Sequence, residues 1–341
     1  MSRGYTAASQ QTMSPILPAD RKTLSPSAAT ECIKRIEQNI GRVIKGKPEA
    51  IRSAVLALVG RGHLLIEDVP GVGKTTLARS IAASIGGTFH RIQFTSDLLP
   101  SDIIGVSVLD ERKGEFVFKP GAVFANVILA DEINRTTPRT QSALLEAMND
   151  YQVSVDGRSH AIELPFMVIA TQNPEEHYGT YPLPESQMDR FSLRIRIDYP
   201  SAQAERDLLL QVGGSSSDNL DKLETVVTPA DVIGIQDAAA QIRLSSELAE
   251  YIVSVARETR NSPILSLGIS PRGQLSWRNV ARANALADGR DFVLPDDLKK
   301  TAVPALAHRV LLQGTSALGS RSREDAERAI EEIVDRFPVP G

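Results

Sequence analysis

The 341-residue sequence lacks the features that mark secreted, disulfide-linked or membrane-spanning proteins. Cys32 is its only cysteine, so no intramolecular disulfide can form. The longest apolar run, residues 54–59, is far shorter than the roughly 20 residues that cross a bilayer. The polar residues 1–15 have no apolar stretch of the kind found in a secretory signal. We therefore expect a cytoplasmic protein that is not an integral membrane protein.

Aromatic residues and excess charge are scarce as well. Aromatic side chains make up 5% of the chain, and the formal net charge is −4. Proteins that bind nucleic acid commonly use aromatic stacking and a basic surface, so this composition argues against a nucleic-acid ligand. Hydrophobic residues at 42% and charged residues at 23% are typical of a folded globular protein, and the length favours about two domains.

Strand-like and helical patterns alternate along the first part of the chain. Such alternation predicts an α/β domain in which helices cover both faces of a mostly parallel sheet. The predicted strands are residues 63–66, 89–94, 127–130, 166–170 and 193–197, and the helices between them include residues 74–85 and 140–149.

Helical periodicity dominates after residue 200, and no strand pattern is visible there. We therefore place a domain boundary near residue 200. The predicted parts are a flexible tail at residues 1–27, a nucleotide-binding α/β domain at residues 28–200 and a helical domain at residues 201–341, with a Gly/Ser-rich loop at residues 213–219.

A glycine-rich turn between a predicted strand and a predicted helix carries the strongest chemical signal. Residues 68–75 read Asp-Val-Pro-Gly-Val-Gly-Lys-Thr. Glycines let successive backbone N–H groups surround a phosphate, and the helix N-terminus adds partial positive charge. Lys74 would reach the β- and γ-phosphates, and the Thr75 hydroxyl would bind Mg²⁺. Asp68 replaces the first glycine of the motif, and its carboxylate is unfavourable near phosphates unless it points away.

Acidic and amide side chains follow two other predicted strands. Asp131 and Glu132 come directly after an apolar strand, at the end where α/β sheets bind ligands. Asp131 would belong to the Mg²⁺ shell, and Glu132 would orient and deprotonate the attacking water. Asn173 follows the strand at residues 166–170; it either hydrogen-bonds the γ-phosphate and the water or is a turn residue before Pro174.

Two arginines further along the chain are candidate site residues. Arg190 precedes the last predicted strand, and it is either a surface cation or a finger that reaches the nucleotide of a neighbouring subunit. Arg272 follows Ser270 and Pro271, which are typical of a helix start. In a helical domain packed over the site, Arg272 could touch the γ-phosphate.

Together these motifs resemble the MoxR family of AAA+ ATPases. The resemblance extends from about residue 30 to the C-terminus, and it implies a P-loop AAA+ αβα sandwich with a parallel sheet followed by a smaller all-helical lid domain. It rests on Gly71-x-Gly73-Lys74-Thr75, on Leu-Ala-Asp-Glu-Ile-Asn-Arg at 129–135, on Ala-Thr-Gln-Asn-Pro at 170–174, on Ser-Pro-Arg at 270–272, and on Lys-Pro-Gly-Ala-Val-Phe-Ala-Asn at 119–126.

The resemblance implies a role for each motif. Asp131 and Glu132 match Walker B, Asn173 matches sensor 1, Arg190 the arginine finger and Arg272 sensor 2. Thr75 and Asp131 would hold the metal. Residues 98–118 correspond to a helix-two insert and residues 152–163 to a β-hairpin before sensor 1. The implied nucleotide-binding residues are Val43, Ile44 and Gly46 near adenine, and Pro70, Gly71, Val72, Gly73, Lys74, Thr75 and Thr76 in and after the Walker A loop.

Members of this family form hexameric rings and remodel client proteins, often with partners that carry a von Willebrand factor A domain. The resemblance therefore implies a ring ATPase that uses ATP and Mg²⁺ to remodel or mature a client. Two alternatives are a nucleic-acid-directed ring motor, which the net charge of −4 disfavours, and a non-hydrolysing nucleotide-dependent scaffold. Asp68 is the sole support for the scaffold, and the intact Lys74, Asp131 and Glu132 argue against it.

Overall fold

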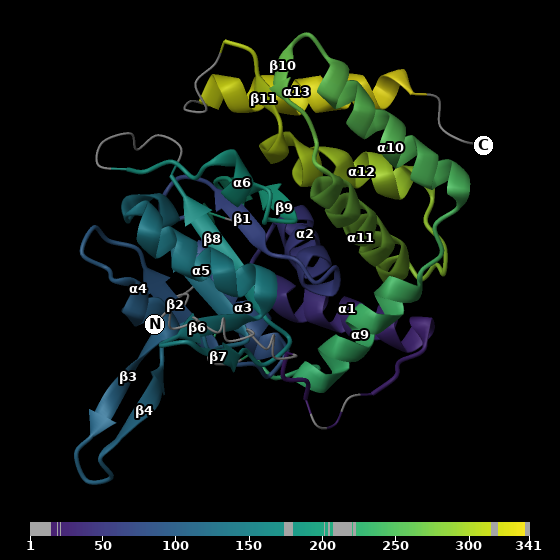
Figure 1. Ribbon diagram of the computed structural model, residues 1–341. Coiled ribbons are helices and arrows are strands. Elements are labelled where there is room, and N and C mark those ends of the chain that lie inside the picture. The colour runs from purple at the N-terminus through teal and green to yellow at the C-terminus, as the bar shows by residue number, and fades with distance from the viewer. Residues whose placement is uncertain are drawn as a thin grey trace, which may run out of the picture.

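The computed structural model describes residues 15–18, 20, 22–173, 180–200, 202–203, 205–206, 220, 223–314 and 320–337. Figure 1 shows a sheet with helices on both sides, followed in sequence by helices packed beside it. The predicted loop at residues 213–219 lies outside the described residues, as do residues 1–14 of the predicted tail. The domain boundary near residue 200 stays a prediction.

The central sheet is entirely parallel, as predicted. Neighbouring strands pair in register, for example Leu64 with Ile169 and Gln93 with Asp131. Because all strands run the same way, the ends of β1, β2, β5 and β8 meet at one edge of the sheet. In spatial order the strands are β2 (Phe89–Gln93), β5 (Val127–Asp131), β8 (Met167–Gln172), β1 (Leu64–Glu67) and β9 (Leu193–Ile195).

Helices cover the two faces of this sheet and create two cores. Alternate residues of β5 enter different cores, since successive side chains of a strand point to opposite faces. Val127 and Leu129 join the first core, whereas Ile128 and Ala130 join the second. The first core includes α1 (Pro26–Gly41), α2 (Pro48–Val59) and α3 (Lys74–Ser84), and the second includes α5 (Pro138–Asp150).

Two β-hairpins extend the α/β part, and one of them projects far from the body (Figure 1). The projecting hairpin spans residues 105–120, and the predicted insert spans residues 98–118, so the two ranges largely coincide. The second hairpin lies where the family resemblance implies one. The Phe118 and His160 rings stack at 3.6 Å and so join the two hairpins. The elements are α4 (Pro100–Ile104), β3 (Gly105–Asp110) and β4 (Glu115–Pro120), then β6 (Gln152–Val155) and β7 (Arg158–Ala161).

One residue of the predicted tail contacts the α/β part. Ile16 pairs with Glu163 next to the second hairpin, and the Ile16 carbonyl accepts a 2.9 Å hydrogen bond from the Leu164 N–H. Helix α1 begins at Pro26, with Ser25 as its N-cap. A single bridging residue has no periodicity that a sequence pattern could reveal, so this contact was not predictable from local sequence.

The C-terminal part is helical, but it also contains a small sheet that the sequence did not predict. Strands β10 (Leu265–Leu267) and β11 (Leu311–Leu312) pair antiparallel, and both are too short to show alternation. Trp277 is fully buried among these helices and donates a hydrogen bond to the Leu298 carbonyl at 3.0 Å. The helices are α9 (Pro229–Gln241), α10 (Ser246–Asn261), α11 (Pro271–Ala287), α12 (Pro295–Leu306), η2 (Ala307–Arg309) and α13 (Ser320–Arg336).

Within the described residues, no helix is long and apolar enough to cross a membrane.

Candidate active site

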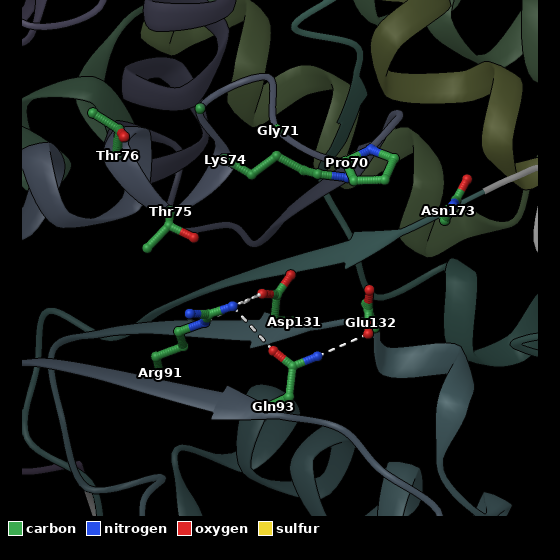
Figure 2. Close-up of a pocket in the computed structure, with 11 residues that line it drawn as sticks. Pro70, Gly71, Lys74, Thr75, Thr76, Arg91, Gln93, Asp131, Glu132 and Asn173 are labelled. Carbon is green, nitrogen blue, oxygen red and sulfur yellow. Dashed lines mark hydrogen bonds and ion pairs between the residues drawn. The ribbon is translucent and has the colours of Figure 1, made fainter. Parts of the chain in front are cut away.

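A cavity of about 360 Å³ opens at the edge of the sheet where the strands end (Figure 2). It lies between the glycine-rich loop after β1 and the ends of β2, β5 and β8. The structure therefore brings together Lys74, Asp131, Glu132 and Asn173, which lie far apart in the sequence. The lining residues are Pro70, Gly71, Gly73, Lys74, Thr75, Thr76, Arg91, Gln93, Asp131, Glu132 and Asn173.

The loop between β1 and α3 has the backbone that a phosphate-binding loop needs. Gly71 and Gly73 have φ angles of 86° and 96°, a region that side-chain-bearing residues rarely adopt. Helix α3 begins at Lys74, so its first N–H groups and positive dipole end lie at the cavity. The Lys74 Nζ donates a 2.6 Å hydrogen bond to the Asp68 carbonyl, which holds the ammonium group against the loop.

The Asp68 carboxylate points away from this cavity. It is 6% exposed and accepts hydrogen bonds from the N–H groups of Val69 at 2.8 Å, Ile197 at 2.6 Å and Asp198 at 2.7 Å. Asp68 thus ties the start of the loop to the chain after β9. The expected conflict between this carboxylate and bound phosphates does not arise, because backbone N–H groups surround it.

Thr171 holds the acidic pair at the end of β5. Its hydroxyl donates to Asp131 Oδ1 at 2.6 Å and accepts from the Glu132 N–H at 2.9 Å. Glu132 has a φ angle of 57°, in the left-handed region that costs energy for a residue with a side chain. This backbone aims the two consecutive side chains into the same cavity, so that one can bind a metal and the other can act on water.

Arg91 and Gln93 are site residues that the sequence reasoning missed. Arg91 forms an ion pair with Asp131 Oδ2 at 2.5 Å, and Gln93 Nε2 donates to Glu132 Oε2 at 2.8 Å (Figure 2). Both side chains lie on one face of β2, two residues apart, beside β5. Polar residues alternating along the predicted strand at residues 89–94 were the available signal.

The oxygen atoms at this site suit Mg²⁺ bound together with a nucleotide. The Thr75 hydroxyl and the Asp131 carboxylate both line the cavity. Mg²⁺ prefers oxygen ligands and usually takes several from water and substrate phosphates. In the described part of the chain no cluster of three or more His, Cys, Asp or Glu side chains could hold a metal on its own, so the phosphates would supply further ligands.

Comparisons with known proteins identify the family. Residues 63–193 match the family described as ATPase family associated with various cellular activities (AAA), and residues 257–333 match the AAA lid domain. The chain is 39% identical to Chaperone MoxR1 of Mycobacterium tuberculosis (strain ATCC 25618 / H37Rv) over 295 residues, 84% of this chain and 77% of that protein. The chain belongs to the MoxR family of AAA+ ATPases.

Two further comparisons cover almost the whole chain of this MoxR-family protein. It is 45% identical to the uncharacterized protein YeaC of Bacillus subtilis (strain 168) over 304 residues, 89% of this chain and 93% of that protein. A crystal structure from Cytophaga hutchinsonii, named as an ATPase, superimposes with a TM-score of 0.80 at 33% identity, covering 92% of this chain and 96% of that one. The MoxR-family chain is therefore an ATP hydrolase with an AAA+ fold and a helical lid, and the non-hydrolysing scaffold is not supported.

The residues expected near adenine flank the cavity of this ATPase but do not line it. Val43 and Ile44 follow α1, and their N–H groups both bond to the Ile40 carbonyl. The Ile44 side chain packs on the first core, and its Cδ1 lies 3.9 Å from the position a Cβ would take on Gly73. Gly46 and Val72 also lie outside the lining. Ile44 is thus the apolar side chain placed beside the loop.

The two arginines assigned to the arginine finger and to sensor 2 lie away from this cavity. Arg190 precedes β9, at the opposite edge of the sheet, and donates to the Leu145 carbonyl of α5. Arg272 donates to Asn149 Oδ1 near the end of α5. Burial lowers the pKa of Arg190, and the positive charge of Arg272 lowers it further, so the two guanidinium groups are near each other.

A contact between Arg272 and a γ-phosphate stays a prediction, and Arg272 does not line the cavity of its own chain. The first turn of α11 packs against the end of α5 and the segment before β9, rather than over the glycine-rich loop. The Arg272 side chain, in this first turn of α11, therefore points to the edge of the sheet opposite the cavity.

Charged side chains of α13 contact the end of β1, the strand that leads into the glycine-rich loop. Arg323 pairs with Glu67, the last residue of β1, and also donates to the Glu67 carbonyl at 3.2 Å. Arg194 lies 3.5 Å from Glu67 and 2.9 Å from Glu327. Burial lowers the pKa of Arg323 to about 10, although Glu67 opposes that shift. The strand that leads into the glycine-rich loop is thus anchored to the lid.

Proposed function

We propose that this MoxR-family ATPase hydrolyses Mg²⁺-ATP at sites shared between neighbouring subunits of a ring, and that it uses this cycle to remodel or mature a client protein. One observation carries the proposal. Lys74, Asp131 and Glu132 line a cavity at one edge of the sheet, whereas Arg190 and Arg272 gather at the other edge. A second subunit could bring the two sets together.

Each of the cavity residues has a distinct role in phosphoryl transfer. Lys74 and the N–H groups of the loop bind the phosphates, and Thr75 and Asp131 hold the metal. Bound Mg²⁺ supplies positive charge to the phosphate oxygens. Glu132 accepts the proton of the attacking water, while Asn173 orients that water near the γ-phosphate. The Val43–Gly46 turn and Ile44 in particular would contact adenine.

Arg190 and Arg272 complete the site from the neighbouring subunit in this proposal. The transferred phosphoryl group spreads negative charge over its oxygens, and a finger arginine raises turnover by about 10³ to 10⁵ in related systems. Arg190 is half-buried, which favours this use, because a guanidinium that has already lost water loses less on approaching phosphate. The proposal also includes assembly into a hexamer, a partner with a von Willebrand factor A domain and a cytoplasmic location. It includes no nucleic-acid ligand. The relative named as a chaperone supports a protein client.

Subunit mixing tests the shared site. Lys74→Ala should abolish ATP binding and hydrolysis, and Glu132→Gln should bind ATP normally but turn over roughly 10²-fold more slowly. Arg190→Ala should also bind ATP and hydrolyse it poorly. In a random mixture of Lys74→Ala and Arg190→Ala subunits, about a quarter of the interfaces pair an intact Lys74 with an intact Arg190, so activity should return. A fully active monomer, or no recovery in co-assembled rings, would contradict the proposal.

Client remodelling needs a separate test. Glu132→Gln rings loaded with ATP should retain bound client and partner proteins, because the cycle stops before hydrolysis. Pull-down with this variant, with Lys74→Ala as the control that cannot bind ATP, would identify proteins held only in the ATP state. Identical sets from both variants would argue against ATP-dependent remodelling.

A further inference from the structure

Asp189, the residue before Arg190, is bound by two side chains from the C-terminal helical part. The Ser270 hydroxyl lies 2.9 Å and 3.1 Å from the two carboxylate oxygens of Asp189 and donates to them. Arg309 Nη1 donates to the same carboxylate, and also to the Asp189 carbonyl at 2.8 Å. One carboxylate thus links residues 189–191, here called the finger segment, to two separate lid elements, α11 and η2.

Arg309 holds the chain on both sides of Arg190. Besides Asp189, it donates through Nη2 to the Phe191 carbonyl at 2.6 Å and through Nε to the Ala305 carbonyl at 2.9 Å. Arg309 is 5% exposed. Burial lowers the pKa of Arg309 and the Asp189 carboxylate opposes this, so the pairing offsets part of the cost of burying the charge. A buried guanidinium with four acceptors leaves the 189–191 backbone little freedom.

Ser270 connects the same carboxylate to Arg272. It is the N-cap of α11, and its Oγ accepts a 3.0 Å hydrogen bond from the Gly273 N–H. Arg272 lies in the first turn of that helix, so the hydroxyl that caps the helix also fixes it to Asp189. Both arginines then reach α5, Arg190 at Leu145 and Arg272 at Asn149.

We propose that Asp189, Ser270 and Arg309 form a positioning unit that holds Arg190 and Arg272 in one relative geometry, so that both reach the nucleotide of the adjacent subunit together. This inference rests on the proposed function, since it assumes that the two arginines act on a neighbour. The three residues touch no phosphate. The carboxylates that raise the pKa of Arg190 are those of Asp150 and Glu146, so Asp189 acts on backbone placement rather than on the charge of the finger.

Variants at Ser270 separate positioning from helix capping. Ser270→Asp keeps a good N-cap acceptor but places a carboxylate against Asp189 in place of a hydroxyl donor. We expect ATP turnover at least tenfold below wild type with ATP affinity within about twofold, because the phosphate loop is untouched. Ser270→Thr keeps both hydrogen bonds and should restore turnover. Asp189→Asn should behave like Ser270→Asp, and Ser270→Asp decides the matter if Asp189→Asn does not fold.

Asp297→Asn is the matched control for a loss of stability. The Asp297 carboxylate is buried in the helical part and pairs with Arg290 at 2.6 Å, away from the finger segment. This variant should lower the melting temperature at least as much as Ser270→Asp while the folded protein keeps wild-type turnover. Equal losses of turnover in both variants would show that the Asp189 cluster only stabilises the fold, and would overturn the inference.

Mixed rings supply a readout that a purely structural role would not give. Ser270→Asp subunits should regain activity when mixed with Lys74→Ala subunits, which contribute an intact finger, but not with Arg190→Ala subunits. The Lys74→Ala and Arg190→Ala mixture is run first as the reference. No recovery in that reference overturns the shared site and the inference with it. If the reference mixture recovers activity, two results overturn the positioning unit alone. One is wild-type turnover in Ser270→Asp, and the other is equal recovery of Ser270→Asp with Lys74→Ala and with Arg190→Ala subunits.

Discussion

Thr171 donates its hydroxyl hydrogen to Asp131 across the neighbouring strands β8 and β5, at 2.6 Å. The same oxygen accepts the Glu132 N–H, so a single buried hydroxyl, 1% exposed, sets the direction of both acidic side chains. In the proposed mechanism, the metal ligand and the general base would therefore both be oriented by Thr171, which does not itself line the cavity.

Thr171→Val should slow ATP hydrolysis about tenfold, because removing the hydroxyl leaves the Glu132 N–H without its acceptor and frees the Asp131 carboxylate. Thr171→Ser keeps the hydroxyl and should stay close to wild type. Steady-state phosphate release at saturating ATP measures the effect. If Thr171→Val and Thr171→Ser are equally active, the hydroxyl does not orient the pair.

Arg91→Gln should tighten the binding of Mg²⁺ at saturating ATP by about fivefold. The Arg91 guanidinium occupies one carboxylate oxygen of Asp131, and its positive charge opposes a second cation there. Titration of Mn²⁺ by electron paramagnetic resonance measures this independently of turnover. Arg91→Lys keeps the charge and serves as the control. Weaker metal binding in Arg91→Gln would mean that Arg91 supports the metal site rather than competing for it.

Asp68→Gly restores the usual first glycine of the phosphate loop, but it should lower both the stability of the fold and the affinity for ATP. The carboxylate accepts three backbone N–H groups, and losing them should reduce the free energy of unfolding by about 3 kcal/mol. ATP affinity should fall as well, since the loop loses its tie to the chain after β9. Chemical denaturation and fluorescent-nucleotide titration test both effects, with Asp68→Asn expected between wild type and Asp68→Gly. Tighter ATP binding in Asp68→Gly would refute this role.

His63 should make the fold sensitive to mild acid. It is buried between the Met148 carbonyl and the Val168 N–H, and burial lowers its pKa to about 4 from 6.5. The unfolded chain binds a proton below pH 6.5 and the folded chain does not until about pH 4. Its contribution is therefore complete above pH 6.5 and is lost as pH falls toward 4, by about 3 kcal/mol in total.

Unfolding free energies of wild type and His63→Gln from pH 8 to pH 4.5 measure this contribution. His63→Gln should be less stable than wild type at pH 8 but should lose less stability on acidification. Burial also lowers the pKa of His308, which remains in both proteins and cancels in the difference. Parallel pH profiles for the two proteins would exclude His63 as a source of acid sensitivity.

Local sequence was sufficient for the strands and for the residues that follow them. The loop at residues 68–75 and the acidic pair at 131–132 each sit at the end of an apolar strand, and the parallel sheet then brings those ends to one edge. The same reasoning missed Arg91 and Gln93, since charged and amide groups on a strand face acquire a partner only when β2 lies beside β5. It also missed β10 and β11, which are too short to produce a pattern.

The sequence by itself determined that this chain has a phosphate loop, an acidic pair and a helical C-terminal part, because each follows from residues close together along the chain. Only the tertiary structure decided where Asp68 and the two arginines point. Asp68 turns toward β9, and Arg190 and Arg272 turn toward α5 at the edge opposite the cavity. Those directions are set by contacts between segments up to 130 residues apart, such as Asp68 with Asp198, and by the need of a buried charge such as that of Asp68 for a partner.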